Sequence, residues 1–283
     1  MGRSIGPMSE WSVVAALGFR HDPDPADRPT PMTPCAEVMV DGSIAGRPYR
    51  FVLDTGAART HVVADDFTTT LAKYGQHNSS GVFALSSNPL VTLPELVVGP
   101  MAGSSVDAVL VDATQPGAQN LLGMDVLKGH RCHFLFDSET LVVEAAREVD
   151  GMRPLQMDDV SHPYVEVSWP DVTAHSVWDS GAGITIVDQA FWRKHPDLFE
   201  EAGTSVGTDA TGTQVETPTF VMAEAEIGGE QFARHRVAVV DLSQANATLD
   251  QPMDLILGYT TLRQANWRFD FPAKRWAITR RLL

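Results

Sequence analysis

Short apolar runs separated by turn residues dominate the chain after Pro34. The runs are rich in Val, Leu and Ile, and most end at Gly, Pro, Asn or Asp. Runs of four to eight residues with such boundaries predict β-strands, and their close spacing predicts a sandwich or barrel rather than alternating strands and helices. The predicted strands are Glu37–Val40, Tyr49–Leu53, Leu93–Val98, Ala108–Val111, Phe134–Phe136, Leu141–Val143, Tyr164–Ser168, Ser176–Trp178, Thr219–Ile227, Arg236–Val240 and Trp267–Phe269.

Helical periodicity is rare in this chain. Trp11–Phe19 fits a short strand or a short helix equally well. Residues 22–34 contain five prolines, which donate no backbone hydrogen bond, so we expect an extended linker there. The predicted helices are Ala64–Tyr74, Asp188–His195 and one short helix after each of Gly123 and Gly258.

The chain contains an internal repeat. In each copy an apolar strand runs into Asp, a small hydroxyl residue, Gly and Ala; a Leu-Gly segment and then an aromatic-x-Phe-Asp segment follow at similar distances. Three landmarks in one order indicate a tandem duplication of a β-rich unit. The landmarks lie at 49–57, 122–123 and 134–137 in the first copy and at 174–182, 257–258 and 267–270 in the second. We therefore divide the chain into an N-terminal extension (1–34), a first lobe (35–149) and a second lobe (150–283).

Asp54 and Asp179 stand at the ends of the two repeated apolar strands. A carboxylate is costly to bury unless it is hydrogen-bonded or shares a proton. If the copies pack about a pseudo-twofold axis, the two side chains meet on it, and carboxylates about 3 Å apart hold one shared proton. Such a pair activates water, because its ionised member accepts a proton from the water and its protonated member donates to the carbonyl under attack. The hydroxyl of Thr55 or Ser180 can bond across to the other copy.

These repeated Asp-Thr-Gly-Ala and Asp-Ser-Gly-Ala sequences, each followed by Leu-Gly, resemble the aspartic proteases. Two copies in one chain resemble the bilobal pepsin-like architecture, and the Ala after each Gly resembles retropepsin-like units. The resemblance covers residues 35–283. It implies an all-β, bilobal acid-protease fold, with two pseudo-twofold-related β-barrel-like lobes and a few short helices. It also implies Asp54 and Asp179 as the catalytic pair, supported by Thr55, Gly56, Ala57, Ser180, Gly181 and Ala182.

Aspartic proteases cover their cleft with a β-hairpin flap. The resemblance implies flap segments at 78–87, which contains Phe83 but not the tyrosine expected in pepsins, and at 206–214, which contains Thr208, Asp209 and Gly212. Ala57 and Ala182 replace the serine that follows the pepsin-type glycine. Because loss of that hydroxyl removes a stabiliser of the ionised carboxylate, we expect optimal activity nearer neutral pH than in gastric-type enzymes.

The net charge and the cysteine content restrict the expected binding partners and cellular compartment of the protein. The chain has 21 Lys and Arg against 36 Asp and Glu, a net charge of −15, which disfavours nucleic acid and membrane surfaces and favours neutral or basic peptides. It has no apolar run long enough to span a membrane and no recognisable signal peptide. Its two cysteines allow at most one disulfide. We therefore expect a cytoplasmic protein.

Three other constellations have plainer interpretations. Gly203-Thr-Ser-Val-Gly207 matches a nucleophile elbow, but it follows a helix-like segment at 197–202 rather than a strand, so we interpret it as a turn. His130, Cys132 and His133 offer three ligands on opposite faces of a strand, so no metal is expected, and no organic cofactor is implied. The residues that flank the aspartate loops, Arg59, His61 and His175, either tune the pair, contact substrate or are merely solvated or bonded to backbone.

The sequence therefore predicts an aspartic endopeptidase that binds an extended peptide or protein segment as an added strand between its lobes. A monomer suffices for activity, since both aspartates belong to one chain. Two alternatives retain the fold: a non-proteolytic acid/base enzyme that uses the pair on a small molecule, and a peptide-binding module with an inactive pair.

Overall fold

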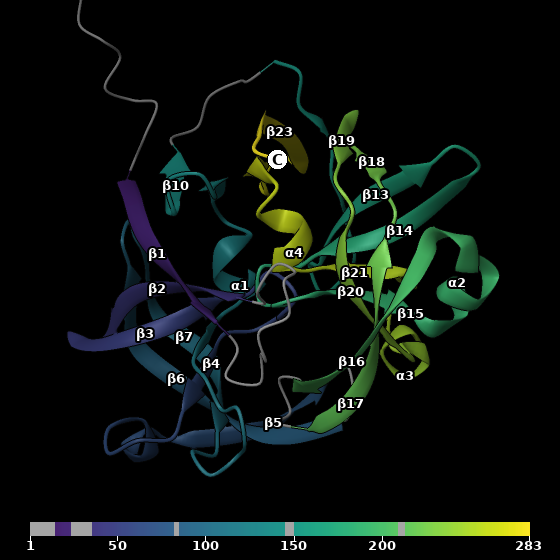
Figure 1. The fold of residues 1–283 in the computed structure, drawn as a ribbon. Coiled ribbons are helices and arrows are strands. Elements are labelled where there is room, and N and C mark those ends of the chain that lie inside the picture. The colour runs from purple at the N-terminus through teal and green to yellow at the C-terminus, as the bar shows by residue number, and fades with distance from the viewer. Residues whose placement is uncertain (1–14, 24–35, 82–84, 145–149, 209–212) are drawn as a thin grey trace, which may run out of the picture.

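The computed structural model describes residues 15–23, 36–81, 85–144, 150–208 and 213–283, and it is mostly β with a few short helices (Figure 1). A 13-stranded sheet runs from one lobe into the middle of the molecule, and a 10-stranded sheet forms the other lobe. The expected all-β bilobal fold class is thereby confirmed. Within the described residues, no helix has the length and apolar character needed to cross a membrane.

Each predicted apolar run lies wholly or largely in a strand, although Thr219–Ile227 is divided between two strands. Several other strands were not predicted, among them Lys73–Ser80 and Phe199–Thr208. Across the larger sheet the order is β11 (Arg153–Pro154), β23 (Arg275–Arg281), β22 (Ala265–Asp270), β9 (Arg131–Leu135), β10 (Thr140–Glu144), β1 (Ala15–Pro23), β2 (Ala36–Ile44), β3 (Arg47–Leu53), β8 (Leu121–Leu122), β4 (His61–Val63), β7 (Met101–Val111), β6 (Leu85–Val98) and β5 (Lys73–Ser80). Across the smaller sheet it is β16 (Phe199–Thr208), β17 (Gln214–Met222), β20 (His235–Val240), β15 (Thr185–Asp188), β21 (Leu255–Leu257), β14 (Val172–Trp178), β13 (Pro163–Trp169), β18 (Ala225–Ile227) and β19 (Glu230–Phe232), with β12 (Gln156–Met157) paired to β13. The helices are α1 (Met124–Leu127), α2 (Gln189–Lys194), α3 (Ser243–Asn246) and α4 (Tyr259–Leu262), with 3-10 turns at Thr68–Thr70 and Pro196–Leu198.

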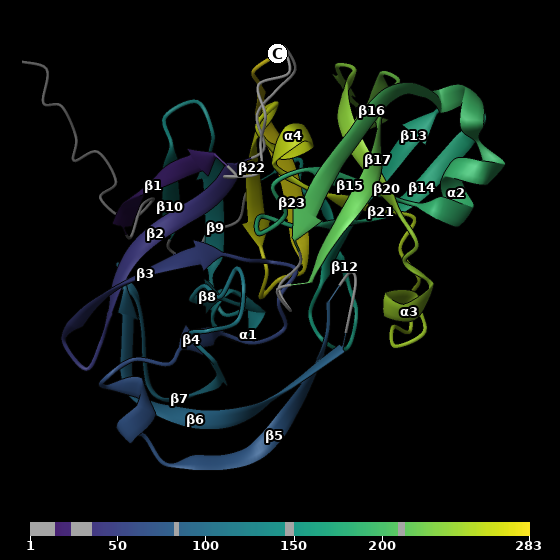
Figure 2. The same ribbon diagram turned by 60° about the horizontal axis from the view of Figure 1, so that its bottom comes forward.

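The two lobes are joined by strand pairing. Strand β9 pairs antiparallel with β22, and Phe134 lies opposite Trp267, the residue at the matching position of the repeat. Figure 2 shows β9, β22 and β23 between the lobes. The pseudo-twofold axis expected from the repeat therefore passes beside Phe134 and Trp267.

Aromatic packing on these central strands anchors the end of β14. Trp178 is fully buried, and its ring centroid lies 4.7 Å from those of Phe134 and Phe269. Burial of a side chain of this size stabilises the fold by roughly 3 kcal/mol. Because Trp178 immediately precedes Asp179, this packing also fixes where the second aspartate loop begins.

The helix predicted over Ala64–Tyr74 is wrong. Only the 3-10 turn Thr68–Thr70 forms, and strand β5 starts at Lys73. The Asp65 carboxylate accepts hydrogen bonds from the Phe67 and Thr68 amides, and the threonine hydroxyls bond back to nearby carbonyls. Such local side-chain bonds compete with helical ones and stop the helix after one turn. The helices predicted at Asp188–His195 and after Gly123 and Gly258 are confirmed as α2, α1 and α4.

The helix-like segment at 197–202 is helical only in part. Asp197 and Leu198 belong to the 3-10 turn, and strand β16 begins at Phe199 and pairs with β17. Gly203 adopts a φ of +89°, and the pairing register shifts between Glu201 and Thr204. The Gly203–Gly207 motif therefore lies in a bulged hairpin strand rather than a turn, so the turn interpretation is wrong, but the motif is not a strand-to-helix elbow.

The N-terminal extension contributes strand β1, which pairs with both β10 and β2. The strand interpretation of Trp11–Phe19 therefore holds from Ala15 onward, and Asp22 and Pro23 of the predicted linker belong to this strand. The rest of the linker and Cys35 lie outside the described residues.

Candidate active site

Each aspartate follows a strand that is held by the same backbone contacts. In both lobes the aspartate amide donates to the Leu carbonyl of the Leu-Gly segment, and the Ala carbonyl of the loop accepts from the first helical amide. The four bonds are Asp54 N to Leu122 O at 3.0 Å, Asp179 N to Leu257 O at 3.0 Å, Met124 N to Ala57 O at 2.8 Å and Tyr259 N to Ala182 O at 2.7 Å. The sequence repeat is thus matched by a repeated backbone arrangement.

The glycine of each Leu-Gly segment is required by close packing. A Cβ on Gly123 would lie 2.5 Å from the carbonyl carbon of Arg59, and one on Gly258 would lie 2.3 Å from the carbonyl oxygen of Ile184. Backbone atoms cannot move aside as a side chain can, so only glycine fits. This close approach explains why the motif recurs at the second landmark of each copy.

Reciprocal hydroxyl bonds join the two aspartate loops. Thr55 Oγ1 donates to Trp178 O at 2.7 Å and accepts from Ser180 N at 3.1 Å. Ser180 Oγ donates to Leu53 O at 2.6 Å and accepts from Thr55 N at 3.2 Å. Both hydroxyl residues are fully buried. The bonds expected between the copies are present, and they satisfy backbone groups that would otherwise be buried without partners.

Gly56 and Gly181 bring each loop against the other loop's carboxylate. A Cβ on Gly56 would lie 2.4 Å from Asp179 Oδ2, and one on Gly181 would lie 2.4 Å from Asp54 Cγ. Any side chain at either position would collide with the opposite aspartate, so this close approach requires glycine.

The two carboxyl groups hydrogen-bond to one another and share backbone donors. Gly56 N lies 2.9 Å from Asp54 Oδ1 and 3.2 Å from Asp179 Oδ1, and Gly181 N donates to Asp179 Oδ1 at 2.8 Å. Burial raises the pKa of Asp54 well above its usual range, and the charge of Asp179 and the hydrogen bond to it raise this pKa further. Burial also raises the pKa of Asp179, but the Gly181 amide and the bond from Asp54 oppose that rise. Both shifts favour a pair that holds one shared proton.

Ala57 and Ala182 act through their backbone. The Ala57 amide hydrogen-bonds to Asp54, and the carbonyls of both alanines accept from the helices behind the loops. Their methyl side chains offer no hydroxyl to the carboxylates, as the sequence indicates.

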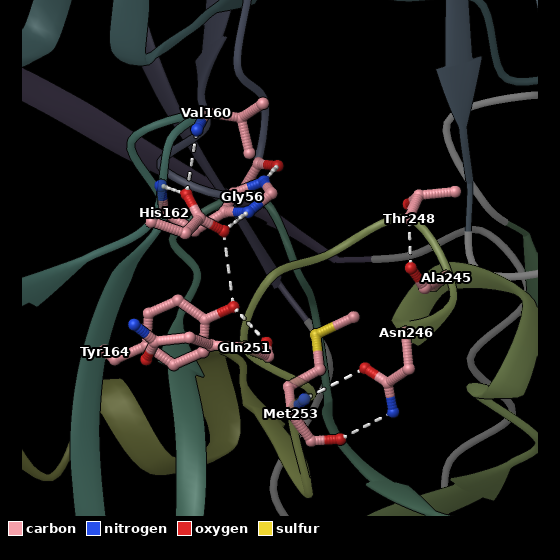
Figure 3. Close-up of polar contacts among 10 residues, drawn as sticks. Gly56, Val160, His162, Tyr164, Ala245, Asn246, Thr248, Gln251 and Met253 are labelled. Carbon is pink, nitrogen blue, oxygen red and sulfur yellow. Dashed lines mark hydrogen bonds and ion pairs between the residues drawn. The ribbon is translucent and has the colours of Figure 1, made fainter.

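A contact that sequence reasoning missed comes from the start of the second lobe. His162 Nε2 lies 2.9 Å from Gly56 O, and His162 Nδ1 lies 2.8 Å from Asp158 Oδ2 (Figure 3). The only local signal is an Asp and a His four residues apart, a spacing too common to be informative. The approach to Gly56, 106 residues away, exists only in the folded chain.

The histidines and the arginine that flank the loops in the sequence have side-chain surroundings of their own. His61 is buried in β4, and burial lowers its pKa to about 4, so its ring is neutral. The His175 ring packs edge-on against Tyr164 at 4.5 Å between centroids. Arg59 lines a cavity of about 360 Å³ with Asp107 and Asp125. A second cavity of about 340 Å³ lies between β17 and α3, and neither cavity is lined by the aspartate pair.

The residues considered for metal binding point apart. Cys132 is buried with a free thiol, and burial raises its pKa to about 12. His133 on the next position of β9 bonds to Thr279 Oγ1 at 2.8 Å. Across the described ranges, no group of three or more His, Cys, Asp or Glu side chains is placed to hold a metal ion.

The two expected flap segments are hairpins of the fold. Strand β5 pairs with β6, and β16 pairs with β17 through Thr208 opposite Gln214. Both views show the strands β5 and β6 extending toward β16 and β17 (Figures 1 and 2). Phe83, Asp209 and Gly212 lie outside the described residues, so the flap assignment stays a prediction.

Comparison with known proteins gives a match over part of the first lobe. Residues 40–129 match the family model described as "gag-polyprotein putative aspartyl protease". The match includes the Asp54 loop and the Leu122-Gly123 segment, so the resemblance to aspartic proteases is confirmed over these residues. It supports a peptidase type of hydrolase. The Asp179 copy lies beyond the matched residues, and no curated protein matches the chain.

Proposed function

We propose that the protein is an aspartic endopeptidase in which Asp54 and Asp179 form one catalytic pair. The observation that carries the proposal is the reciprocal packing of the two loops, in which each glycine lies against the carboxylate of the other loop. The match of residues 40–129 to an aspartyl protease family supports the same chemistry. The proposal treats the second copy as an equal half of the site, with Asp179 in the role that Asp54 has in the first.

In this proposal the shared proton is on Asp54 and the charge is on Asp179, because the charge of His162 lies near Asp179. Asp179, which holds the charge, accepts a proton from a water molecule between the two groups, and the water oxygen attacks the peptide carbonyl carbon. Asp54 gives its proton to the carbonyl oxygen, which forms a neutral tetrahedral intermediate. Asp179 then passes the water-derived proton to the departing nitrogen, the C–N bond breaks, and Asp54 recovers its proton from the intermediate. One water is consumed, and the pair returns to its starting state.

The environments of the two carboxyl groups predict the pH dependence. Activity requires one proton on the pair, so kcat/KM rises with pH through the lower macroscopic pKa and falls through the higher one. Burial raises the pKa of both groups, and that of Asp54 well above its usual range. The singly protonated pair therefore persists to higher pH than isolated carboxyl groups allow, in agreement with the expected optimum nearer neutral pH.

The proposed substrate is an extended segment of a peptide or protein, bound by one copy of the chain. The β5–β6 and β16–β17 hairpins are the proposed covers. Val206 and Val215 on the second hairpin are 43% and 40% exposed, and Tyr74 on the first is 41% exposed, so each hairpin offers apolar contact surface. The net charge of −15 favours neutral or basic segments.

Mass spectrometry of a random peptide mixture tests the proposal. The wild-type protein is expected to cleave internal peptide bonds, and Asp54→Asn and Asp179→Asn are each expected to lose about 10³-fold or more of that activity. Asp41→Asn is the matched control, because Asp41 is an exposed aspartate of the first lobe, and it should cleave normally.

A statine-containing peptide, which mimics the tetrahedral intermediate, separates the alternatives. Binding without cleavage by the wild-type protein would indicate a peptide-binding module. The absence of both cleavage and binding would contradict the peptidase proposal and would favour acid/base chemistry on a small molecule.

A further inference from the structure

A histidine of the second lobe holds the loop of the first aspartate. His162 immediately precedes β13, and its two ring nitrogens face Asp158 Oδ2 at 2.8 Å and Gly56 O at 2.9 Å. Both of these oxygens can only accept a hydrogen bond. A neutral imidazole has one N–H, so only the imidazolium can donate to both oxygens at once. Deprotonation must therefore break one of the two contacts.

Asp158 is itself fixed in place. Its Oδ1 accepts from the His162 amide at 2.8 Å and from the Val160 amide at 3.1 Å. The Tyr164 hydroxyl, which donates to Gln251 O at 2.8 Å, lies 3.3 Å from Oδ2 (Figure 3). The Asp158 side chain is only 2% exposed. These contacts leave the carboxylate no freedom to follow the imidazole if the ring moves.

The Gly56 carbonyl leads directly to the carboxylate pair. It belongs to the same peptide group as the Ala57 amide, which hydrogen-bonds to Asp54. The Gly56 amide, one peptide group earlier, contacts both Asp54 and Asp179. A cation bonded to the Gly56 carbonyl polarises its peptide group and strengthens the Ala57 amide as a donor. It also holds the orientation of the loop that supplies these donors.

We propose that His162 is a positioning residue whose protonated ring, held by Asp158, fixes the Gly56 loop and favours the ionised form of the aspartate pair. The coupling between His162 and the pair is a property of the fold. Its effect on catalysis rests on the proposed peptidase function.

The groups around the ring favour its protonation. Asp158 faces it from its own segment, Asp179 from the end of β14 and the Asp54 loop from the end of β3. The Tyr164 hydroxyl lies beside Asp158, and Asp250 adds negative charge near Asp158. His175 of β14 packs on Tyr164. Burial lowers the pKa of His162, but the bond and charge of Asp158, the Gly56 carbonyl and the charge of Asp179 together raise it above its usual value.

The arrangement occurs on one side of the pseudo-twofold axis. Strand pairing places Tyr164 opposite Val177 and Met39 opposite Val52, so the repeat equivalent of His162 is Glu37. The second copy alone supplies a histidine at this position. The charge of His162 is one of the factors that oppose the rise in the pKa of Asp179. His162 thereby contributes to the difference between the pKa values of the two aspartates.

NMR titration of the histidine rings tests the coupling without any substrate. The His162 signal, identified by its loss in His162→Gln, should titrate above pH 6.5. Asp158→Asn should lower its pKa by roughly one unit or more, and Asp179→Asn should lower it by a smaller amount. The signal of His195, which packs on Phe191 of α2, serves as the internal control and should not change. A His162 pKa at or below 6.5, or one that Asp179→Asn leaves unchanged, would overturn the inference.

The pH profile of peptide cleavage tests the consequence for catalysis. His162→Gln should lower kcat by about tenfold with KM nearly unchanged, and should move the acid limb of kcat/KM to higher pH, because Asp179 loses a nearby cation. His195→Gln is the matched control. If folded His162→Gln has a pH profile of kcat/KM with the same shape as that of the wild-type protein, His162 has only a structural role and the proposal is wrong. If no variant cleaves peptide but the NMR coupling is present, the peptidase proposal fails while the coupling stands.

Discussion

Replacement of Thr55 by Val should destabilise the protein strongly, although the two side chains have almost the same shape. The Thr55 hydroxyl donates to Trp178 O at 2.7 Å and accepts from Ser180 N at 3.1 Å, and both bonds cross between the lobes. Valine can do neither. Thr55, Trp178 and Ser180 are all fully buried, so water cannot replace the lost hydroxyl.

The magnitude follows from the groups left behind. A buried donor or acceptor without a partner costs about 1–3 kcal/mol, and Thr55→Val leaves one of each. We therefore expect a loss of about 2–6 kcal/mol in the free energy of unfolding, a large part of the roughly 5–15 kcal/mol typical of folded proteins. Ser180→Ala should cost a similar amount, because its hydroxyl satisfies Leu53 O and Thr55 N in the same way.

Urea denaturation followed by tryptophan fluorescence measures these losses. The double variant Thr55→Val/Ser180→Ala should lose less than the two single losses together, because the hydroxyls belong to one network. Thr70→Val is the control: its hydroxyl bonds to Phe67 O at an exposed turn, and its loss should be within about 0.5 kcal/mol. A loss below about 1 kcal/mol for Thr55→Val would refute the view that these bonds hold the two loops together.

Three further predictions concern the glycines, the aspartates and the lobe interface. Gly181→Ala should abolish peptide cleavage, because its Cβ would lie 2.4 Å from Asp54 Cγ. The control Gly129→Ala should cleave normally, because no atom lies nearer than 3.7 Å to its Cβ. Equal activity of the two variants would contradict the packing argument. Asp54→Asn should raise the free energy of unfolding at pH 7, because the folded state raises the pKa of Asp54 and ionisation of this group above its usual pKa opposes folding. The gain, about 1.4 kcal/mol per unit of pKa shift, should vanish below about pH 4. A gain that is independent of pH in urea denaturation would argue against this explanation. Glu144→Ala should lower the free energy of unfolding by roughly 3 kcal/mol, because the largely buried Arg268 of β22 loses the carboxylate that lies 2.7 Å away on β10. The double variant Glu144→Ala/Arg268→Met should recover much of that loss in the same denaturation assay.

The parts of the site that sequence predicts are those encoded by short local patterns. The loops of Asp54 and Asp179 are recognisable because an apolar strand, a carboxylate, a hydroxyl and a glycine must be adjacent for the loop to form. The Leu-Gly landmark is recognisable because any side chain at Gly123 or Gly258 would collide with backbone. Repetition of these patterns in one chain then predicts that the two aspartates meet.

The parts that sequence reasoning misses depend on competition or on distance. The predicted helix over Ala64–Tyr74 fails because Asp65 and the following threonines offer the backbone nearer partners than helical ones. His162 is missed because its contact with Gly56 joins two lobes, and no local sequence pattern distinguishes His162.

A carboxyl ¹³C NMR titration of the two aspartates tests the central claim most directly, namely that the copies build one proton-sharing pair. Asp54 and Asp179 should titrate in two coupled steps, with the upper step well above the usual aspartate pKa. Because the charge of Asp179 raises the pKa of Asp54, Asp179→Asn should lower the pKa of Asp54. Two independent titrations near the usual pKa of about 3.9, unchanged when either partner is replaced, would contradict the account.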